Sequence, residues 1–204
     1  SVEVKEPMIA LLVNGEPAQT RFDDETYFLR QALDVPVTDA RQIAFETREA
    51  KELGKLDDVT VVALCNVPSL RPAEIARLRS FVQRGGGLVV FLGDTVEPDD
   101  YDNLIRAQLV PGTFTRGRVA VPRRIMTWDA EHPAMELFSK REAGDLSRIV
   151  FRDVFDVKPD SKAVVLARLD NNRPAFVSST LGRGNVLLVT NPCDREWSDW
   201  PAER

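Results

Sequence analysis

Residues 58–94 read DVTVVALCN, VPSLRPAEIARLRSFVQR, GGG and LVVFLGD in succession, and this stretch decides the fold. Its two short, almost continuously apolar runs, Val59–Leu64 and Leu88–Leu92, are typical of strands buried on both faces of a sheet. Between them, apolar residues such as Ile75 and Leu78 recur at helical spacing. The stretch therefore predicts a strand, a helix and a second strand, joined as a right-handed parallel crossover.

Three consecutive glycines, Gly85–Gly87, separate the predicted helix from the second strand. A phosphate-binding loop has the opposite order, because it lies between a strand and the start of the next helix. Glycine is strongly favoured just after a helix, where the chain takes a left-handed turn. The glycines therefore predict the end of a helix rather than a phosphate site.

The first half of the chain alternates predicted strands and helices around this unit. Strands are expected over residues 8–13 and 42–47, and helices over residues 23–33 and 101–109. This order predicts an α/β fold, namely a flavodoxin-like, doubly wound and mostly parallel sheet with helices on both faces.

The second half has a different pattern, with short apolar runs separated by turns. It predicts a β-rich C-terminal part with antiparallel strands. We expect one domain over residues 1–204, in which an α/β core (1–112) is completed by a β-rich extension (113–204).

Composition excludes several classes of protein. Of the 204 residues, 43% are hydrophobic and 29% charged, as in ordinary globular proteins, and the net charge is −5. No basic cluster is dense enough to predict binding to nucleic acid, and no apolar run is long enough to predict membrane insertion. The chain begins at Ser1 without a methionine, so we expect a piece excised from a longer protein, whose compartment the sequence leaves open.

Polar side chains follow the predicted parallel strands. Asn14, Glu16, Asn66 and Asp94 should all lie at the carboxyl edge of the sheet, where open α/β sheets bind ligands. They predict a polar crevice for a small ligand. The alternative is turn chemistry, since Asn and Asp side chains also end strands by bonding to nearby backbone.

Two residues are weak catalytic candidates. Cys65 ends a predicted strand and is either a nucleophile or a buried structural cysteine. His132, the only histidine, is either a general base or a surface residue at the entry to a helix. No metal site and no cofactor are predicted, because the acidic run over residues 97–102 lacks the glycine and terminal glutamate of a calcium loop.

The segment AEIARLRSFVQRGGGLVVF resembles the class I glutamine amidotransferase-like superfamily. Two further pairs of segments resemble its non-catalytic members, the ThuA-like domains and the amidotransferase-like domains of BatA-related bacterial membrane proteins. The pairs are LLVNGEP with DETYFLRQAL, and GRGNVLLVTNP with DREWSDWP. The resemblance places Phe91 where the enzymes carry their nucleophilic cysteine. It also implies a histidine followed two residues later by glutamate, whereas Ala134 stands two residues after His132.

The resemblance therefore implies a non-catalytic domain rather than an enzyme. The leading hypothesis is an interaction or ligand-sensing module of a larger bacterial envelope protein. The partners of this module would be other protein domains. The first alternative is a hydrolase or amidotransferase that uses Cys65 and His132. The second is a domain that binds a carbohydrate or another small ligand.

Overall fold

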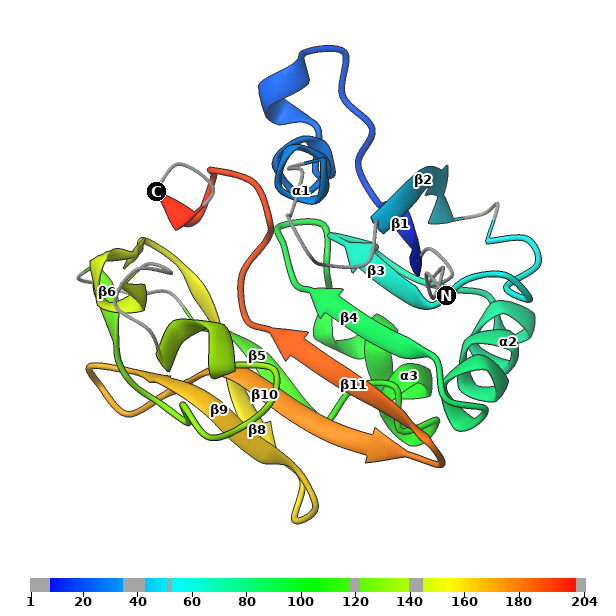
Figure 1. The fold of residues 1–204 in the computed structure, drawn as a ribbon. Helices are drawn as coiled ribbons and strands as arrows, with labels where there is room; N and C mark the ends of the chain where they lie inside the picture. The colour runs from blue at the N-terminus through cyan, green and yellow to red at the C-terminus, as the bar shows by residue number, and fades with distance from the viewer. Residues whose placement is uncertain (1–7, 35–42, 51–52, 118–121, 140–144, 201–204) are drawn as a thin grey trace, which may run out of the picture.

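The computed structural model describes residues 8–34, 43–50, 53–117, 122–139 and 145–200. Within these residues the main sheet has nine strands (Figure 1). Their spatial order is β2 (Ile43–Glu49), β1 (Met8–Asn14), β3 (Val61–Cys65), β4 (Gly87–Phe91), β11 (Gly184–Val189), β10 (Pro174–Leu181), β9 (Val164–Leu169), β6 (Arg123–Trp128) and β7 (Val150–Phe151). Two more strands, β5 (Gly112–Gly117) and β8 (Val154–Pro159), pair antiparallel as a separate ribbon.

The main sheet is mixed and divides into two halves. Strands β2, β1, β3, β4 and β11 are all parallel, and we call them the parallel half. Strands β10, β9, β6 and β7 pair antiparallel, and we call them the antiparallel half. Strand β11 joins the two halves, because it is parallel to β4 on one side and antiparallel to β10 on the other.

The predicted strand–helix–strand unit is confirmed. Strands β3 and β4 are parallel neighbours, and α2 (Pro72–Gln83) connects them. The Arg71 N–H donates to the Glu74 carboxylate at 3.0 Å, which satisfies a backbone donor at the start of the helix. At the other end, Gly85 has a φ of 117° and the Gly86 N–H donates to the Phe81 carbonyl at 3.1 Å. The glycines therefore end the helix, as predicted.

Each face of the main sheet has its own apolar core. The first face is covered by α2, α3 (Asp102–Arg106) and the β5–β8 ribbon, in which Phe114 and Phe155 meet edge to face with ring centroids 5.2 Å apart. The second face is covered by α1 (Tyr27–Leu33), by short 3-10 turns and by the tail after β11, in which Trp200 packs against Phe176 at 5.2 Å. The described residues include the 3-10 turns η1 (Arg21–Asp23), η3 (Pro98–Tyr101), η4 (Glu136–Ser139) and η6 (Leu146–Arg148), of which η3 lies on the first face, where Tyr101 joins the core.

The prediction of a flavodoxin-like sheet with helices on both faces is wrong. The described residues contain three α-helices, of which only α2 is longer than seven residues, and the chain is β-rich with a large mixed sheet. The helix expected over residues 101–109 is only five residues long. The apolar surface that further helices would bury is covered instead by the β5–β8 ribbon and by the C-terminal tail. Alternation in the first half of the chain therefore overstated the helix content.

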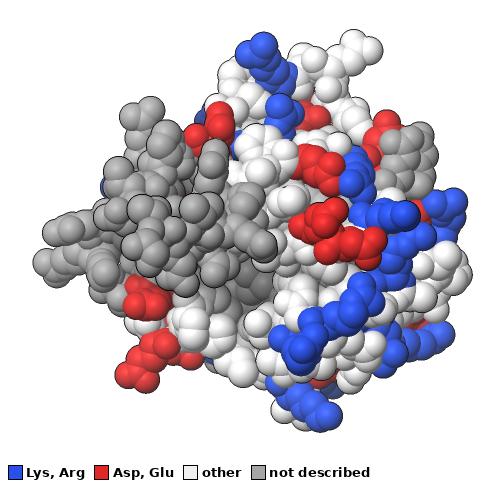
Figure 2. Space-filling model, turned by 45° about the vertical axis from the view of Figure 1, so that its right-hand side comes forward, with Lys and Arg blue, Asp and Glu red and all other residues white. Residues whose placement is uncertain are grey.

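The surface presents charges of both signs. On the face drawn in Figure 2, Lys and Arg side chains form a band beside a group of Asp and Glu side chains. None of the helices in the described ranges combines the length and apolarity needed to cross a membrane.

Candidate functional site

The carboxyl edge of the parallel half gathers the four residues that the sequence predicted there. In the register of the sheet, Asn14 lies opposite Cys65, so the segments that follow β1 and β3 leave the sheet side by side. The Asn66 side-chain amide donates to the carboxylates of Asp94 at 2.7 Å and Glu16 at 3.3 Å. The Glu16 N–H in turn donates to the Asn14 side-chain oxygen at 3.1 Å. The four residues form one hydrogen-bonded network.

Asn66 is the centre of this network. It is fully buried and has a φ of 50°, a left-handed conformation that asparagine tolerates better than most residues. Its Oδ1 accepts the N–H of Thr95 at 3.1 Å and the Thr95 hydroxyl at 2.8 Å. Because Oδ1 faces these two donors, Nδ2 must face the carboxylates, and the hydrogen bonds themselves fix the orientation of the amide.

Two glycines make room for Asn66. A Cβ on Gly15 would lie 1.9 Å from the Asn66 carbonyl oxygen, and a Cβ on Gly93 would lie 2.4 Å from Cγ of the Asn66 side chain. Both distances are far below van der Waals contact. The loops after β1 and β4 therefore close on Asn66 only because these two positions lack a side chain.

Glu25 is the residue of the site that sequence reasoning missed. It lies between η1 and α1, is 2% exposed, and accepts a hydrogen bond from Asn66 Nδ2 at 2.6 Å. The neighbouring Asp24 carboxylate fixes this turn, because it accepts the Thr26 N–H at 3.0 Å and an Asn14 side-chain N–H at 2.8 Å. Glu25 therefore enters the site from a segment that the sequence predicted only as the start of a helix.

The tail after β11 closes the site from the far side. The Cys193 thiol donates to the Glu25 backbone carbonyl at 2.9 Å, and Asp194 is 2% exposed. The contact joins positions 168 residues apart in the chain. Burial of Glu25 thus depends on the C-terminal segment, and no local sequence pattern signals it.

Crowding of carboxylates perturbs their protonation. Burial, together with the negative charges of Asp194 and Asp94, raises the pKa of Glu25 from 4.5 to about 8. Burial and Asp94 also raise the pKa of Glu16, and burial raises the pKa of Asp194. None of the ion pairs within the described ranges includes these carboxylates. Among the described residues, the site therefore concentrates carboxylates that no ion pair neutralises.

The two weak catalytic candidates do not form a pair. Cys65 is fully buried, and its thiol faces the Ala63 carbonyl at 4.0 Å. The Nδ1 of His132 accepts the Ala134 N–H at 3.2 Å within its own loop. In the part of the chain that the structure describes, no hydrogen bond joins Cys65 to His132. The arrangement lacks the contact between nucleophile and base that covalent catalysis uses.

Hollows lie at both edges of the parallel half. One of about 300 Å³ adjoins the site and is lined by Asn14, Gly15 and Glu74, among others. A larger one of about 710 Å³ lies at the amino edge, where Thr60 and Gly86 contribute to its wall. Only the smaller hollow shares a residue with the Asn66 network, so we place the candidate site at the carboxyl edge.

Comparison with known proteins defines the fold. No family model matches the chain, and no curated protein matches its sequence. The cytoplasmic protein STM1381 from Salmonella typhimurium LT2 has a similar structure, with a TM-score of 0.68, 15% identity, and coverage of 93% of this chain and 90% of that one. The cytoplasmic protein STM3548 from Salmonella typhimurium gives a TM-score of 0.66 at 14% identity, covering 93% and 89%.

A larger protein contains a similar fold as one part. The β-galactosidase from Rahnella sp. R3 matches with a TM-score of 0.62 at 16% identity, over 91% of this chain and 28% of that one. At these identities the likenesses establish the fold alone.

The predicted membership of the class I glutamine amidotransferase-like superfamily is wrong. No family model supports it, the fold is β-rich, and the two similar structures named above are described as cytoplasmic proteins of Salmonella. Phe91 fills a place in the core, where it is 7% exposed and lies 6.5 Å from Trp200 between ring centroids. The resemblance was built from apolar strand and glycine patterns that many sheets share. The expectation of a domain from an amidotransferase-like membrane protein loses its basis with it.

Proposed function

We propose that this chain is a non-catalytic, ligand-sensing module that binds a positively charged ligand at the carboxyl edge of its parallel half. One observation carries the proposal. Three carboxylates from three separate segments, Glu16, Glu25 and Asp94, are held around the buried amide of Asn66. Carboxylates held together repel one another once they are ionised, and a bound cation would compensate that cost.

The proposed sensing role rests on the separate segments of the chain to which these carboxylates belong. Glu16 follows β1, Asp94 follows β4, and Glu25 precedes α1 and touches the tail through Cys193. A ligand that neutralises all three would draw these segments together. Occupancy would therefore alter the stability and shape of the carboxyl edge of the sheet.

A thermal-shift screen tests this proposal. Metal ions and organic amines such as spermidine form the cationic arm, and neutral sugars, amino acids and nucleotides form the other. A ligand that binds only the native state raises the Tm. We expect shifts in the cationic arm alone, and shifts confined to sugars or nucleotides would refute the proposal.

A catalytic role would require different behaviour. Hydrolysis of glutamine or of a simple ester by the purified protein, lost in Cys65→Ser, would contradict a non-catalytic module. The buried thiol of Cys65 and the local hydrogen bond of His132 favour the absence of such activity.

Binding of another protein domain is the second candidate function, favoured by Phe22. Its side chain is 64% exposed next to the site and contacts Tyr27 and Phe28, with centroids 5.4 and 6.4 Å away. Exposed aromatic residues often anchor interfaces. Phe22→Ser should weaken binding of a protein partner while leaving the response to cations unchanged. Titration of the parent chain and of Phe22→Ser with a protein partner and with cations would measure both effects.

A further inference from the structure

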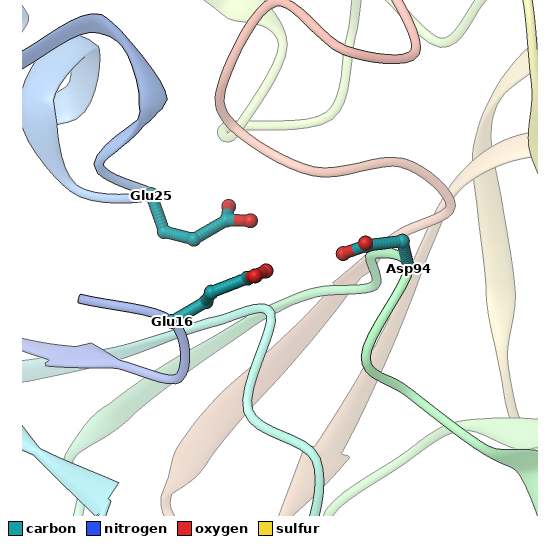
Figure 3. Close-up of side chains that lie close together, drawn as sticks. All are labelled: Glu16, Glu25 and Asp94. Atoms are coloured by element: carbon teal, nitrogen blue, oxygen red, sulfur yellow. The ribbon is translucent and has the colours of Figure 1, made fainter. Parts of the chain in front are cut away.

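The three carboxylates of the site are close enough to share one ion. A carboxylate oxygen from each of Glu16, Glu25 and Asp94 lies within 4.8 Å of the other two. Figure 3 shows the three side chains converging from separate parts of the ribbon, with the carboxyl end of Glu25 pointing toward those of Glu16 and Asp94. Glu16 and Asp94 are exposed, so the site is open to solvent on one side.

A second observation points to a missing partner. Glu25 is 98% buried, its Oε1 accepts the Asn66 amide, and its Oε2 is buried without a hydrogen-bond partner among the described residues. Buried polar atoms are nearly always paired, because leaving one unpaired costs about 1–3 kcal/mol. Protonation does not remove the problem, since a hydroxyl at Oε2 would then be a donor without an acceptor.

Asn66 cannot satisfy the three carboxylates alone. Its Nδ2 carries two hydrogens and lies within hydrogen-bond distance of three acidic side chains. Its Oδ1 is already occupied by Thr95, so the amide cannot turn. The network therefore orients the carboxylates and leaves part of their negative charge unpaired.

Two further acidic residues near the site add negative charge, while the nearby Arg116 guanidinium donates to the Asp94 backbone carbonyl and pairs with the Glu97 carboxylate. Asp194 and Glu196, both after β11, lie close enough for their negative charges to act on Glu25. The Cys193 thiol is buried and donates its hydrogen to the Glu25 backbone carbonyl at 2.9 Å, so it is not a free ligand for a metal. The available donors are therefore oxygens.

We propose that Glu16, Glu25 and Asp94 bind a hard divalent cation, Ca²⁺ or Mg²⁺, with Asn66 holding the carboxylates in place. Oxygen-only donor sets select these ions, whereas thiolate and imidazole ligands favour zinc and copper. Solvent completes the coordination on the exposed side. The inference rests on the proposed function, because it names the class of cation that the site takes, and it replaces the sequence-based prediction of no metal site.

Thermal unfolding and calorimetric titration test the inference. The full chain is treated with EDTA, dialysed, and titrated at pH 8 with CaCl₂ or MgCl₂, in parallel with spermidine. At one hundred times the dissociation constant, we expect a rise in Tm of about 5 °C or more. Comparison of the two salts distinguishes Ca²⁺ from Mg²⁺.

Matched variants assign the binding to these residues. Glu25→Gln keeps the shape of the side chain and should weaken binding of the divalent cation at least 10-fold. Asp94→Asn, at an exposed position that tolerates substitution, should have a similar effect. Glu131→Gln, which changes an exposed carboxylate in the loop after β6, should bind like the parent chain.

Two results would overturn the inference. One is an absent response to both salts in the parent chain. The other is an equal response in the parent and in both site variants. If spermidine still raised the Tm in either case, the metal inference would fail while the proposed function stood, and failure of all cations would remove both.

Discussion

The two halves of the main sheet end their strands in different ways. In the parallel half, the segments after β1, β3 and β4 leave from one edge, and Asn66 ties them together. In the antiparallel half, successive strands reverse through short turns, such as residues 170–173 between β9 and β10. Parallel pairing thus collects loop residues from distant parts of the chain at one place, whereas antiparallel pairing disperses them.

The same amino acid shows the contrast within one chain. Asn66 and Asn172 both have positive φ angles, 50° and 66°. The side chain of Asn66 is fully buried and bonds to four residues, whereas Asn172 belongs to a turn and its backbone carbonyl accepts a hydrogen bond from Arg168 at 3.0 Å. The conformation is shared, but only the parallel edge uses the side chain to build a site.

The largest expected effect is on pH dependence, and it concerns the parallel edge alone. Glu25 has a folded pKa of about 8 against 4.5 for the free side chain, so the folded state holds its proton more tightly. The contribution of this proton to the free energy of unfolding is therefore complete below pH 4.5 and is lost as the pH rises toward 8. The loss is at most about 5 kcal/mol, at about 1.4 kcal/mol per unit of pKa difference. Urea unfolding at intervals from pH 5 to 8.5, without metal, measures the slope.

Glu25→Gln should remove most of this loss, and Glu131→Gln should leave it unchanged. Added Ca²⁺ or Mg²⁺ should also flatten the profile of the parent chain, because a metal ion displaces the proton. A parent chain that is equally stable at pH 5 and pH 8 would contradict the electrostatic description of the site.

Truncation of one buried and one exposed side chain tests which strand positions contribute to the core of the main sheet. Leu64 in β3 is fully buried, and Leu64→Ala should cost about 2–5 kcal/mol in unfolding free energy. Met126 in the antiparallel half is 66% exposed, so Met126→Ala should change stability by no more than about 0.5 kcal/mol. Equal costs in denaturant titrations would contradict the burial of Leu64 in the core of the main sheet.

Glycine substitution tests the closure of the loops on Asn66. A Cβ at Gly15 meets backbone at 1.9 Å, and Gly15→Ala should cost about 1–3 kcal/mol or more. Gly117 in the ribbon is the milder comparison, because a Cβ there would lie 3.2 Å from both the end of the Arg173 side chain and the Asp156 Cβ. Gly117→Ala should therefore cost less than Gly15→Ala, and equal costs in the two variants would show that the loops around Asn66 pack more loosely.

The smallest effects separate conformation from side-chain chemistry. Glycine adopts positive φ easily, so Asn172→Gly should change stability by only a few tenths of a kcal/mol. Asn66→Gly still allows the positive φ but leaves Thr95 and the carboxylates without their hydrogen-bond partner. This loss should lower the free energy of unfolding by about 1–3 kcal/mol. Thermal unfolding of both variants provides the comparison, and similar losses would deny Asn66 its central role.

Sequence reasoning succeeded where the chain interacts locally. The strand–helix–strand unit, the glycine helix end and the gathering of Asn14, Glu16, Asn66 and Asp94 all follow from patterns within a few tens of residues and from the geometry of parallel strands. Whether those four residues bind a ligand stays a prediction.

Sequence reasoning failed where distant segments decide the structure. Glu25 is buried by a tail 168 residues away, so its position next to Asp23 and Asp24 suggested only a helix start. The β5–β8 ribbon pairs residues 112–117 with residues 154–159 and covers a face for which helices were expected. Apolar patterns common to many sheets also produced a family resemblance that neither the fold nor the comparisons support.

One measurement tests the central claim most directly. Crystals of the chain soaked in Mn²⁺, an oxygen-binding ion with a strong anomalous signal, would locate the cation by anomalous diffraction. We expect a single strong peak between the carboxylates of Glu16, Glu25 and Asp94, which disappears in Glu25→Gln. A map with no peak there, or with peaks only at other carboxylates, would contradict the claim that the parallel edge is a cation-binding site.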